Sequence, residues 1–399
     1  MRTPIRIVLG IFVTGMVLAC TLFALAQTKS SSVNSYPIIN VTPSRAASVT
    51  VNRNWQLGAP VTFQALTVFP VITDQLESID DYITLDEGLR SRKVIVSEIG
   101  ANGRTRRVGH GRPVSDNAEV NRLMVTNKSG KTLVLIAGEI IIGGKQDRIV
   151  GEDCVIASSN KPVPVDVYCV EHGRWDERSG FGRSRTNNNT ASSGGTGGGA
   201  GGGNAVHLAA TAPGTFSAPA SGGMAAPKVR AKAQAEKSQD GVWTEVAKLE
   251  SSNSVSSSTG TLNKVYEDRR VSAKLNDYER AIRNKLSGKN VIGAVVAIGG
   301  QLLSADVFAS PRLFQAYWPK LLKSYALEAV SSGGSNSQSV ERTAAESFLA
   351  RVDAPASSEG KKSGYKLTEY QSDRDASFEL ESVEQGAEKL IHFNRVNKK

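Results

Sequence analysis

The first hydrophobic feature of the chain is an apolar run close to its N-terminus. A basic start, MRTPIR, precedes IVLGIFVTGMVLACTLFALA, whose last residues form the small-x-small sequence ALA. This order is typical of a secretory signal peptide over residues 1–26, cut after Ala26. Two alternatives remain open: VLAC, which ends at Cys20, resembles a lipid-attachment motif, and the run is almost long enough to stay as an uncleaved membrane anchor.

A strand-rich region follows. Residues 27–48 are rich in Ser and Thr and predict a flexible tether, whereas residues 49–183 carry the two-residue alternation of apolar and polar positions that indicates strands. RLMVT and TLVLIA flank the turn-forming cluster NKSGK, which predicts a hairpin. Thr84 and Glu87 have the spacing of a capping box, so we expect a short helix to begin there.

A glycine-rich segment then interrupts the pattern. Eight of the ten residues from Gly194 to Gly203 are glycine, with Asn, Ser, Ala and Pro around them. Such a composition cannot bury enough apolar surface to offset its ordering entropy, so residues 184–239 are predicted to be a disordered insertion. Lengthening an exposed loop from about ten to about fifty-seven residues costs only about 1.5 kcal/mol. The residues before and after the insertion can therefore belong to the same domain.

Helical patterns dominate residues 240–330. In SPRLFQAYWPKLLKSYALEAV, Ser310 is expected as the N-cap, and Pro319 is expected to kink or restart the helix. VIGAVVAIGGQLLSADVF predicts two strands joined by a Gly-Gly turn, and residues 331–399 predict a polar linker, one helix and closing strands. The fold class is therefore α+β: a mixed, mostly antiparallel sheet, helices concentrated in the C-terminal half, and one domain split by the insertion.

The net charge, the histidines and the cysteines do little to narrow the possible functions. The chain has 48 Lys and Arg against 38 Asp and Glu, and a basic surface attracts anions without selecting among them, so no specific nucleic acid is predicted. Its four histidines are scattered, and no metal or cofactor is expected. Cys154 and Cys169 are the candidate disulfide of an exported chain. Their bridge would close a 15-residue loop and stabilise the fold by about 3 kcal/mol.

Two glutamates are candidate catalytic residues. Glu139 in AGEIIIGGKQDRIV and Glu171 in VPVDVYCVE each follow an alternating apolar strand. A carboxylate at the border of an apolar face has a raised pKa, which suits general acid–base catalysis. The alternative is that each pairs with an arginine, Arg148 or Arg174, and fixes the geometry of a strand end.

The polar residues beside these glutamates are candidate ligand contacts. GEIIIGGKQ lacks the register and the hydroxyl residue of a phosphate-binding loop, but its glycines offer N–H groups to an anion. Lys145 and Arg148 would add positive charge, and Gln146 lies between them; the alternative is a turn whose charges cancel. Trp175, next to Arg174, is suited to stacking on a ring or to packing in the core.

Cys169 is the third catalytic candidate. Together with His172 it has the chemistry of a nucleophile and its base. The two residues lie on opposite faces of a strand unless the chain turns at Glu171. The alternative is a buried cysteine that packs as a small apolar group.

Five blocks of sequence occur in the following order: TLDEGL, VLIAGEIIIGGKQDRIV, VPVDVYCVEHGRW, QDGVW and VVAIGGQLLSADVFASPRLFQAYWPKLLKSYALEA. Together they resemble the ADP-ribosylglycohydrolase and rhodanese-phosphatase-superfamily-associated protein domain, over most of residues 61–330. This family has no established activity to transfer. Its name reflects neighbouring domains that process ADP-ribose, so the resemblance implies a nucleotide-type ligand by association only. Cys169 lies in a matching block and Cys154 does not.

Three functional hypotheses follow. The chain is an exported, non-catalytic binding domain for an anionic small molecule or partner; or a hydrolase of a phosphate-containing or ADP-ribose-like compound, with Glu139 or Glu171 as base; or a structural envelope protein. Contact with a membrane is expected only through an uncleaved or lipidated N-terminus. The sequence alone does not choose between an enzyme and a binding protein.

Overall fold

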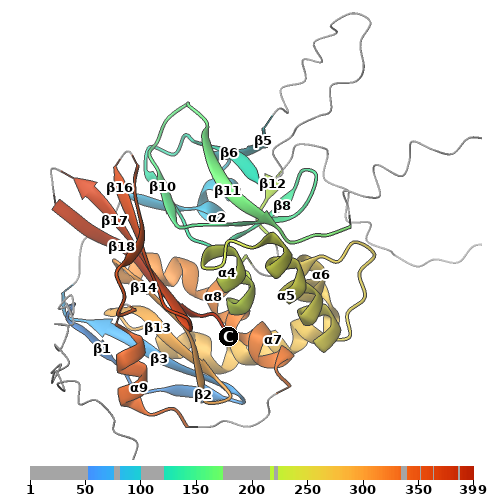
Figure 1. Ribbon diagram of the computed structural model, residues 1–399, viewed down its shortest axis with the longest axis vertical. Helices are drawn as coiled ribbons and strands as arrows, with labels where there is room; N and C mark the ends of the chain where they lie inside the picture. The colour runs from blue at the N-terminus through green and yellow to red at the C-terminus, as the bar shows by residue number, and fades with distance from the viewer. Residues whose placement is uncertain are drawn as a thin grey trace, which may run out of the picture. The chain divides into compact units, whose positions relative to one another are not determined.

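The computed structural model shows an α+β fold with mostly antiparallel sheets, as predicted (Figure 1). The residues that it describes all belong to one compact unit, Thr50–Lys399. They are residues 53–75, 81–99, 121–173, 216–219, 223–333, 339–350, 352–362, 364–384 and 387–399. The predicted signal peptide, with Cys20, and the predicted tether lie outside the described residues, and so do Arg174 and Trp175.

The large sheet combines strands from both ends of the unit. Its nine strands are β1 (Trp55–Leu57), β2 (Val61–Phe63), β3 (Leu66–Thr73), β13 (Val291–Ile298), β14 (Gln301–Phe308), β15 (Ala356–Lys362), β16 (Tyr365–Gln371), β17 (Asp375–Glu384) and β18 (Ala387–Asn397). They follow the order β1-β3-β13-β14-β18-β17-β16-β15, with β2 paired to β3, and every pairing is antiparallel. The last strand of the chain, β18, therefore lies between β14 and β17.

The predicted Gly-Gly turn is confirmed. Gly299 and Gly300 join β13 to β14 with φ values of 56° and 82°. Two consecutive positive φ angles define a turn whose twist matches that of the flanking strands, and glycine adopts them without steric cost.

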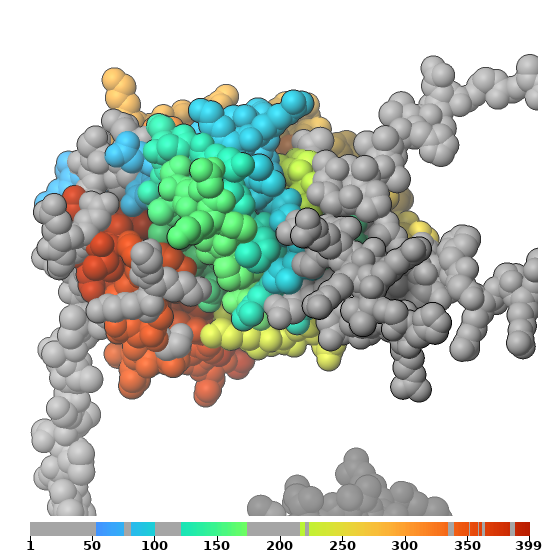
Figure 2. Space-filling model, turned by 90° about the horizontal axis from the view of Figure 1, so that it is seen from above, coloured from blue at the N-terminus to red at the C-terminus, as the bar shows by residue number. Residues whose placement is uncertain are grey.

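Two smaller sheets are built from the first half of the chain. They contain β4 (Tyr82–Thr84), β5 (Val94–Glu98), β6 (Arg122–Asn127), β7 (Thr132–Leu135), β8 (Ile140–Gly143), β9 (Arg148–Val150), β10 (Cys154–Ile156), β11 (Val163–Cys169) and β12 (Phe216–Ser217). The orders are β10-β7-β4, where β4 and β7 are parallel, and β12-β8-β9-β11-β6-β5. Figure 2 shows these strands, in cyan to green, beside the orange-red C-terminal strands.

The predicted hairpin of RLMVT and TLVLIA is wrong. Strand β6 pairs with β5 and β11, whereas β7 pairs with β4 and β10. The turn itself closes around the buried Asn127, whose Nδ2 donates to the carbonyl oxygens of Lys131 (2.7 Å) and Ile156 (2.8 Å). The contact with Ile156 connects the turn to β10, so the two strands diverge into different sheets.

The helices are α2 (Leu85–Arg90), α4 (Pro227–Gln234), α5 (Gln239–Ser252), α6 (Leu262–Glu267), α7 (Arg269–Ile282), the 3-10 turn η1 (Arg283–Leu286), α8 (Pro311–Ser331) and α9 (Arg342–Phe348). Both halves of the predicted capping box between Thr84 and Glu87 are present. Ser310 caps α8 by accepting the N–H of Leu313. Helix α8 continues through Pro319, so it does not restart there. Burial of the aromatic and leucine stripe on both sides of this proline outweighs the lost backbone hydrogen bond.

The predicted insertion, residues 184–239, extends too far at its C-terminal end. Helix α4 and the first residue of α5 lie inside this range. The composition argument fails here because alanines also pack in a core: Ala231 of α4 and its C-cap Ala235 belong to the same small cluster as Phe378. Residues 184–215 lie outside the described part of the chain.

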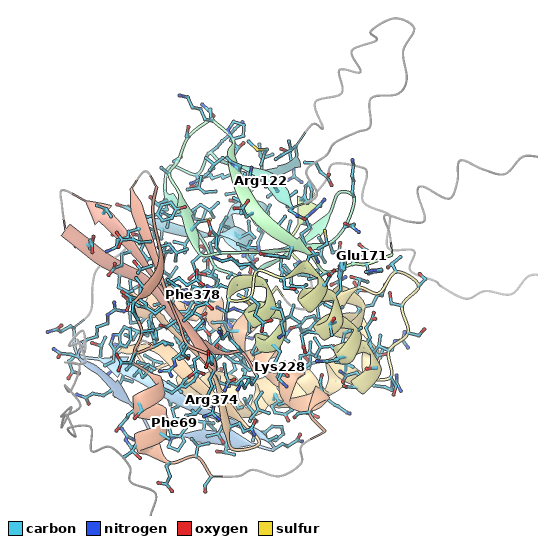
Figure 3. The ribbon with its side chains drawn as sticks, viewed as in Figure 1. Phe69, Arg122, Glu171, Lys228, Arg374 and Phe378 are labelled. Atoms are coloured by element: carbon cyan, nitrogen blue, oxygen red, sulfur yellow. The ribbon has the colours of Figure 1, made fainter. Side chains whose placement is uncertain are left out.

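The apolar core lies mainly around α8 and the smaller sheets. Its main cluster includes Tyr317, Trp318 and Leu321 of α8, while Phe69 and Phe378 belong to two smaller clusters (Figure 3). No helix among the described residues is both long and apolar enough to cross a membrane.

Candidate functional site

The loop between β8 and β9 holds the predicted anion-binding residues. The N–H of Gly143 faces the Oδ1 of Asp147 at 3.3 Å, and the N–H of Lys145 donates to the Oε1 of Glu98 at 2.6 Å. These are two of the backbone groups that an anion would need. The protein's own carboxylates occupy both of them.

Arg148 also takes part in this internal arrangement. Its guanidinium is buried, and Nη1 contacts the Oε1 of Glu98 at 3.3 Å and the carbonyl oxygen of Gln146 at 3.0 Å. Arg148 therefore contacts the carboxylate of Glu98. The alternative interpretation of the sequence had paired it with Glu139. Burial raises the pKa of the Cys169 thiol, and the nearby Arg148 offsets this only in part. A raised pKa disfavours the thiolate that a cysteine nucleophile requires.

Glu171 contacts the β8–β9 loop through both its side chain and its backbone. Its Oε2 accepts the N–H of Asp147 at 3.1 Å, and its carbonyl oxygen accepts the Nε2 of Gln146 at 2.9 Å. The backbone of Glu171 also forms a bridge with Thr261, whose hydroxyl donates to Asp147 at 3.2 Å. Glu171, which Figure 3 labels, therefore joins the end of β11 to the β8–β9 loop and to the start of α6.

Glu139 has a different set of partners. Its Oε1 lies 2.5 Å from the Nζ of Lys320 on α8, and Lys320 also contacts Asp86 of α2 at 3.1 Å. Its Oε2 accepts the N–H of Ile136 at 2.9 Å. Burial raises the pKa of Glu139, and the facing ammonium opposes this shift. Burial alone would lower the pKa of Lys320, but the carboxylates of Glu139 and Asp86 raise it.

The two candidate glutamates are thus buried in separate networks. Among the described residues, Glu139 contacts α8 and its own turn, whereas Glu171 contacts the β8–β9 loop and the α6 cap. Among the described residues, Glu139 contacts Lys320 and a backbone N–H group, and Glu171 accepts the N–H of Asp147. Arg174, one of the two arginines considered as partners, lies outside the described residues.

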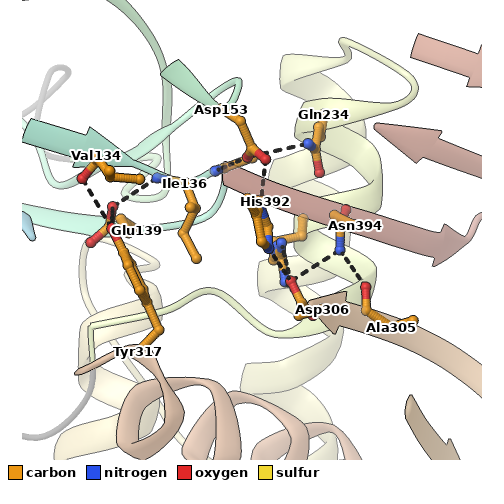
Figure 4. A network of polar contacts seen from close by, with 12 residues as sticks. Val134, Ile136, Glu139, Asp153, Gln234, Ala305, Asp306, Tyr317, His392 and Asn394 are labelled. Atoms are coloured by element: carbon orange, nitrogen blue, oxygen red, sulfur yellow. Dashed lines mark hydrogen bonds and ion pairs between the residues drawn. The ribbon is translucent and has the colours of Figure 1, made fainter. Parts of the chain in front are cut away.

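A buried charged network that the sequence did not predict lies where α4, β14, β18 and the loop before β10 meet (Figure 4). The Nδ1 of His392 lies 2.6 Å from Asp153, and its Nε2 lies 3.2 Å from Asp306. Arg230 of α4 contacts both carboxylate oxygens of Asp306, at 3.2 and 2.8 Å. All four of these side chains are fully buried.

The network is balanced in charge when His392 is protonated. Burial alone would lower the pKa of His392, but the flanking carboxylates raise it. Burial alone would raise the pKa of Asp306, but Arg230 and His392 hold it below its usual value. The hydroxyl of Tyr325 and the amide of Asn394 also donate to Asp306. Buried charges persist when they are paired and hydrogen-bonded. This network therefore connects α4, β14, β18 and the loop before β10.

A cavity lies next to this network, and Gln234 contacts both. The amide Nε2 of Gln234, the last residue of α4, faces Asp153 at 3.5 Å. The volume of the cavity is about 170 Å³. It is lined by Glu152, Gln234, Lys237, Glu359, Gly360, Tyr365, Leu367, Glu369 and Phe378. The cavity thus lies between the C-terminal end of α4, the loop before β10, and strands β15–β17.

A family model of the ARG and Rhodanese-Phosphatase-superfamily-associated Protein domain matches residues 54–194 and 212–396. The chain belongs to this family. No curated protein and no solved structure matches the chain. The match runs past residue 330, where we expected it to end, so the family domain includes the closing strands. Residues 195–211, which the match leaves out, belong to the glycine-rich segment.

Within the family domain, the sequence carried a weak signal of the buried network. Asp306 interrupts the apolar strand LLSADVF, and His392 interrupts KLIHF. A charged residue in the middle of a buried strand requires a partner, but the partners lie 76 and 239 positions away along the chain. Contacts at that separation cannot be derived from local spacing.

The expected disulfide is absent from the structure. Cys154 lies on β10 and Cys169 at the end of β11, in different sheets, and both are buried thiols that take part in no disulfide. Across the described part of the family domain, no group of three or more His, Cys, Asp or Glu side chains is arranged to hold a metal ion.

Proposed function

We propose that this chain is an exported, non-catalytic binding domain whose ligand occupies the cavity between α4 and strands β15–β17. One observation carries the proposal: the Oε1 of Gln234, on a side chain only 2% exposed, meets no hydrogen-bond donor among the described residues. Buried polar atoms of native proteins are almost always paired. Gln234 belongs to the cavity wall, but its Oε1 is fully buried, so a ligand supplies the missing donor only after this side chain turns toward the cavity.

The size of the cavity limits the ligand. A cavity of about 150 Å³ accommodates a benzene molecule, and this cavity measures about 170 Å³. It therefore suits a small metabolite or a single side chain of a partner, and it is too small for a dinucleotide. The anionic ligand expected at the β8–β9 loop has less support, because Glu98 and Asp147 already take the N–H groups of that loop.

A hydrolase of a phosphate-containing or ADP-ribose-like compound is the second candidate function. The raised pKa of Glu139 favours it, because general acids need such a shift. The complete burial of Glu139 and its contact with Lys320 weigh against it, since a substrate must reach the carboxylate. Turnover of such compounds that is lost in Glu139→Gln, with folding retained, would favour the hydrolase over the binding domain.

A matched pair of substitutions tests the binding proposal. A Cβ added at Gly360 would meet nothing within 4 Å, so Gly360→Ala leaves the cavity open and Gly360→Phe fills part of it. Small metabolites that raise the melting temperature of the wild type and of Gly360→Ala should not do so for Gly360→Phe. Equal protection of both variants would contradict a ligand in this cavity. The structural envelope role would gain support if no compound protected any of the three proteins.

A further inference from the structure

We infer that the cavity binds an apolar side chain of an extended segment from a partner protein, and that this segment adds to the large sheet as a strand beside β15. The inference rests on the proposed function, because it assigns a partner class to the same cavity. Its basis is the open edge of β15, the missing side chain at Gly360, and the apolar side chains of β16 and β17 in the cavity wall.

Strand β15 ends the large sheet. Among the described strands it pairs with β16 alone, and its residues Ala356, Ser357, Glu359 and Gly360 are exposed. A terminal strand presents backbone N–H and C=O groups without a neighbouring strand, and extended peptides add to a sheet at such an edge. The backbone of β15 therefore offers hydrogen bonds to an added strand.

The register of the β15–β16 hairpin identifies the backbone groups at this edge. Two residues connect the strands, and Lys362 is paired with Tyr365. The pair that closes a two-residue hairpin exchanges both backbone hydrogen bonds, and hydrogen-bonded pairs then alternate along the ladder. Gly360 consequently directs its N–H and C=O toward β16, whereas Glu359 and Lys361 direct theirs to the open edge. An antiparallel strand added there would exchange hydrogen bonds with Glu359 and Lys361.

Gly360 determines where a side chain of the added strand can go. It lines the cavity together with its partner on β16, Leu367, so both residues lie on the cavity side of the sheet. Directly opposite residues of an antiparallel pair share one face, so the added residue opposite Gly360 would also point to this side. A Cβ at Gly360 would meet nothing within 4 Å. The opposite side chain can therefore extend over the glycine into the cavity.

Three aromatic or aliphatic side chains form part of the cavity wall. Tyr365 and Leu367 are two positions apart on β16 and share one face of the sheet, and Phe378 of β17 lines the cavity beside them. A cavity of about 150 Å³ accommodates benzene, and this one measures about 170 Å³. The ring of a phenylalanine fits this volume, and its burial against these side chains stabilises the complex.

The charged groups of the cavity do not call for a charged ligand. Glu152 and Glu369 both have interaction partners within the protein. For Glu369 these include Lys237 and Gln371. Glu359 is next to the cavity-facing glycine on β15, so its side chain points to the opposite face of the sheet. A charged side chain would lose its hydration in the cavity without gaining a free partner, so an apolar side chain is favoured.

The test uses capped heptapeptides and isothermal titration calorimetry. The reference peptide, Lys-Thr-Thr-Phe-Thr-Thr-Lys, has phenylalanine at its centre and β-branched threonines on both sides. It should bind the protein, and an analogue with alanine in place of phenylalanine should bind at least about tenfold more weakly, because the cavity stays empty. Equal affinity of the two peptides, or no binding of the reference peptide, would overturn the inference.

N-methylated peptides test the strand geometry. With phenylalanine opposite Gly360, the N–H groups of the two flanking threonines point to β15, and the N–H of phenylalanine points to solvent. Methylation of both flanking nitrogens should weaken binding about tenfold or more, because two hydrogen bonds are lost. Methylation of the phenylalanine nitrogen is the matched control and should retain binding. The opposite order of affinities would contradict a strand added beside β15.

A matched pair of substitutions tests the protein side of this edge. Glu359→Pro removes an N–H that points to the open edge, whereas Glu359→Ala keeps it, and both leave the ladder with β16 in place. Only the proline variant should lose affinity for the reference peptide, about tenfold. Gly360→Phe should abolish binding, because its ring takes the space of the incoming one. Equal affinities of the two Glu359 variants would overturn the inference; if the proline variant does not fold, the N-methylated peptides decide.

A second copy of this chain is the alternative occupant of the edge. Two β15 strands paired about Gly360 would place glycine opposite glycine, so neither cavity would receive a side chain. Analytical ultracentrifugation should therefore show a monomer at the concentrations of the titration. A dimer that Glu359→Pro dissociates and that the reference peptide leaves intact would overturn the inference in favour of self-pairing.

This inference and the proposed function fail in different ways. If small metabolites protect the wild type and Gly360→Ala but not Gly360→Phe, while the reference peptide does not bind, the cavity is a ligand site and only strand addition is wrong. If Gly360→Phe leaves protection by every metabolite and binding of every peptide unchanged, the binding proposal for this cavity fails together with the inference.

Discussion

The Nδ1 of His392 lies 2.6 Å from the Oδ2 of Asp153, which joins the last strand of the large sheet to the loop before β10. The other ring nitrogen faces Asp306 at 3.2 Å, and Arg230 balances the second carboxylate. An imidazolium between two carboxylates is stabilised relative to the neutral ring, although burial opposes this. The protonation of His392 is therefore coupled to the folding of the whole unit.

The first prediction concerns pH. The pKa of His392 is raised in the folded state, so its contribution to stability is complete below about pH 6.5, the unfolded value, and is lost as pH rises through the folded pKa. The free energy of unfolding should therefore decline between pH 6 and pH 9 in urea titrations. His392→Gln should remove this decline and cost about 3–5 kcal/mol at pH 6, because Asp153 loses its charged partner.

His172→Gln is the control for the pH experiment. His172 contacts Trp243 edge to face and takes no part in the buried network. The decline with pH should persist in this variant. A wild-type stability that stays constant from pH 6 to pH 9 would contradict a charged His392.

The second prediction concerns the ion pair of Glu139 and Lys320. Glu139→Gln should lower the free energy of unfolding by about 3 kcal/mol, because a buried ammonium loses its 2.5 Å partner. Lys320→Met should have a similar effect. The double variant should be less destabilised than the sum of the two, since only the partly exposed Asp86 then lacks its partner. Chemical denaturation of all four proteins measures this coupling. Additive effects would show that the pair makes no net interaction.

The third prediction compares two glycines with positive φ. Gly138 and Gly130 have φ values of 88° and 80°. A Cβ at Gly138 would overlap the Cγ and Cδ of Arg230, whereas one at Gly130 would meet nothing within 4 Å. Gly130→Ala should cost about 1–2 kcal/mol from backbone strain alone. Gly138→Ala should cost about 1–3 kcal/mol more, because the buried Arg230–Asp306 pair must shift.

Thermal and urea unfolding of these two alanine variants provides the measurement. Equal losses would indicate that Arg230 moves without cost and that the buried network tolerates displacement.

The fourth prediction concerns the cysteines. In a chain that starts at residue 27, Cys154 and Cys169 are the remaining thiols, and both are buried. An aromatic disulfide reagent should leave the native protein unmodified and should titrate two thiols per chain in denaturant, without prior reduction. Recovery of no thiol until a reductant is added would mean that the two residues form a disulfide.

Local chemistry predicted the local elements well. The capping box at Thr84, the cap at Ser310 and the Gly299–Gly300 turn each depend on residues within four positions, and all three are confirmed. The hairpin of β6 and β7 was wrong because a tertiary contact, from Asn127 to Ile156, decides where the strands go. Distant contacts also explain why α4 was not predicted, because Ala231 of this helix packs in a cluster with Phe378 of β17, far away along the chain.

Whether a residue of the candidate site could be predicted also depends on how far its partners lie along the chain. The sequence placed Glu171 at the end of a strand, and it lies two residues after β11. It placed Glu139 at the end of the TLVLIA strand, but β7 ends at Leu135 and Glu139 directly precedes β8. It could not identify Lys320, which is 181 positions from Glu139, or the cavity, whose walls come from α4 and from strands more than a hundred residues later. Side chains that a fold collects from remote segments leave no regular spacing in the sequence.

The position of β18 between β14 and β17 has a consequence for synthesis. A nascent chain cannot complete the large sheet until residues 387–397 have left the ribosome, because they form the interior strand β18. Premature termination before this strand would divide the sheet into two parts and remove His392. Chains that terminate before residue 387 should therefore be degraded by proteases, rather than persist as shortened proteins that keep the fold.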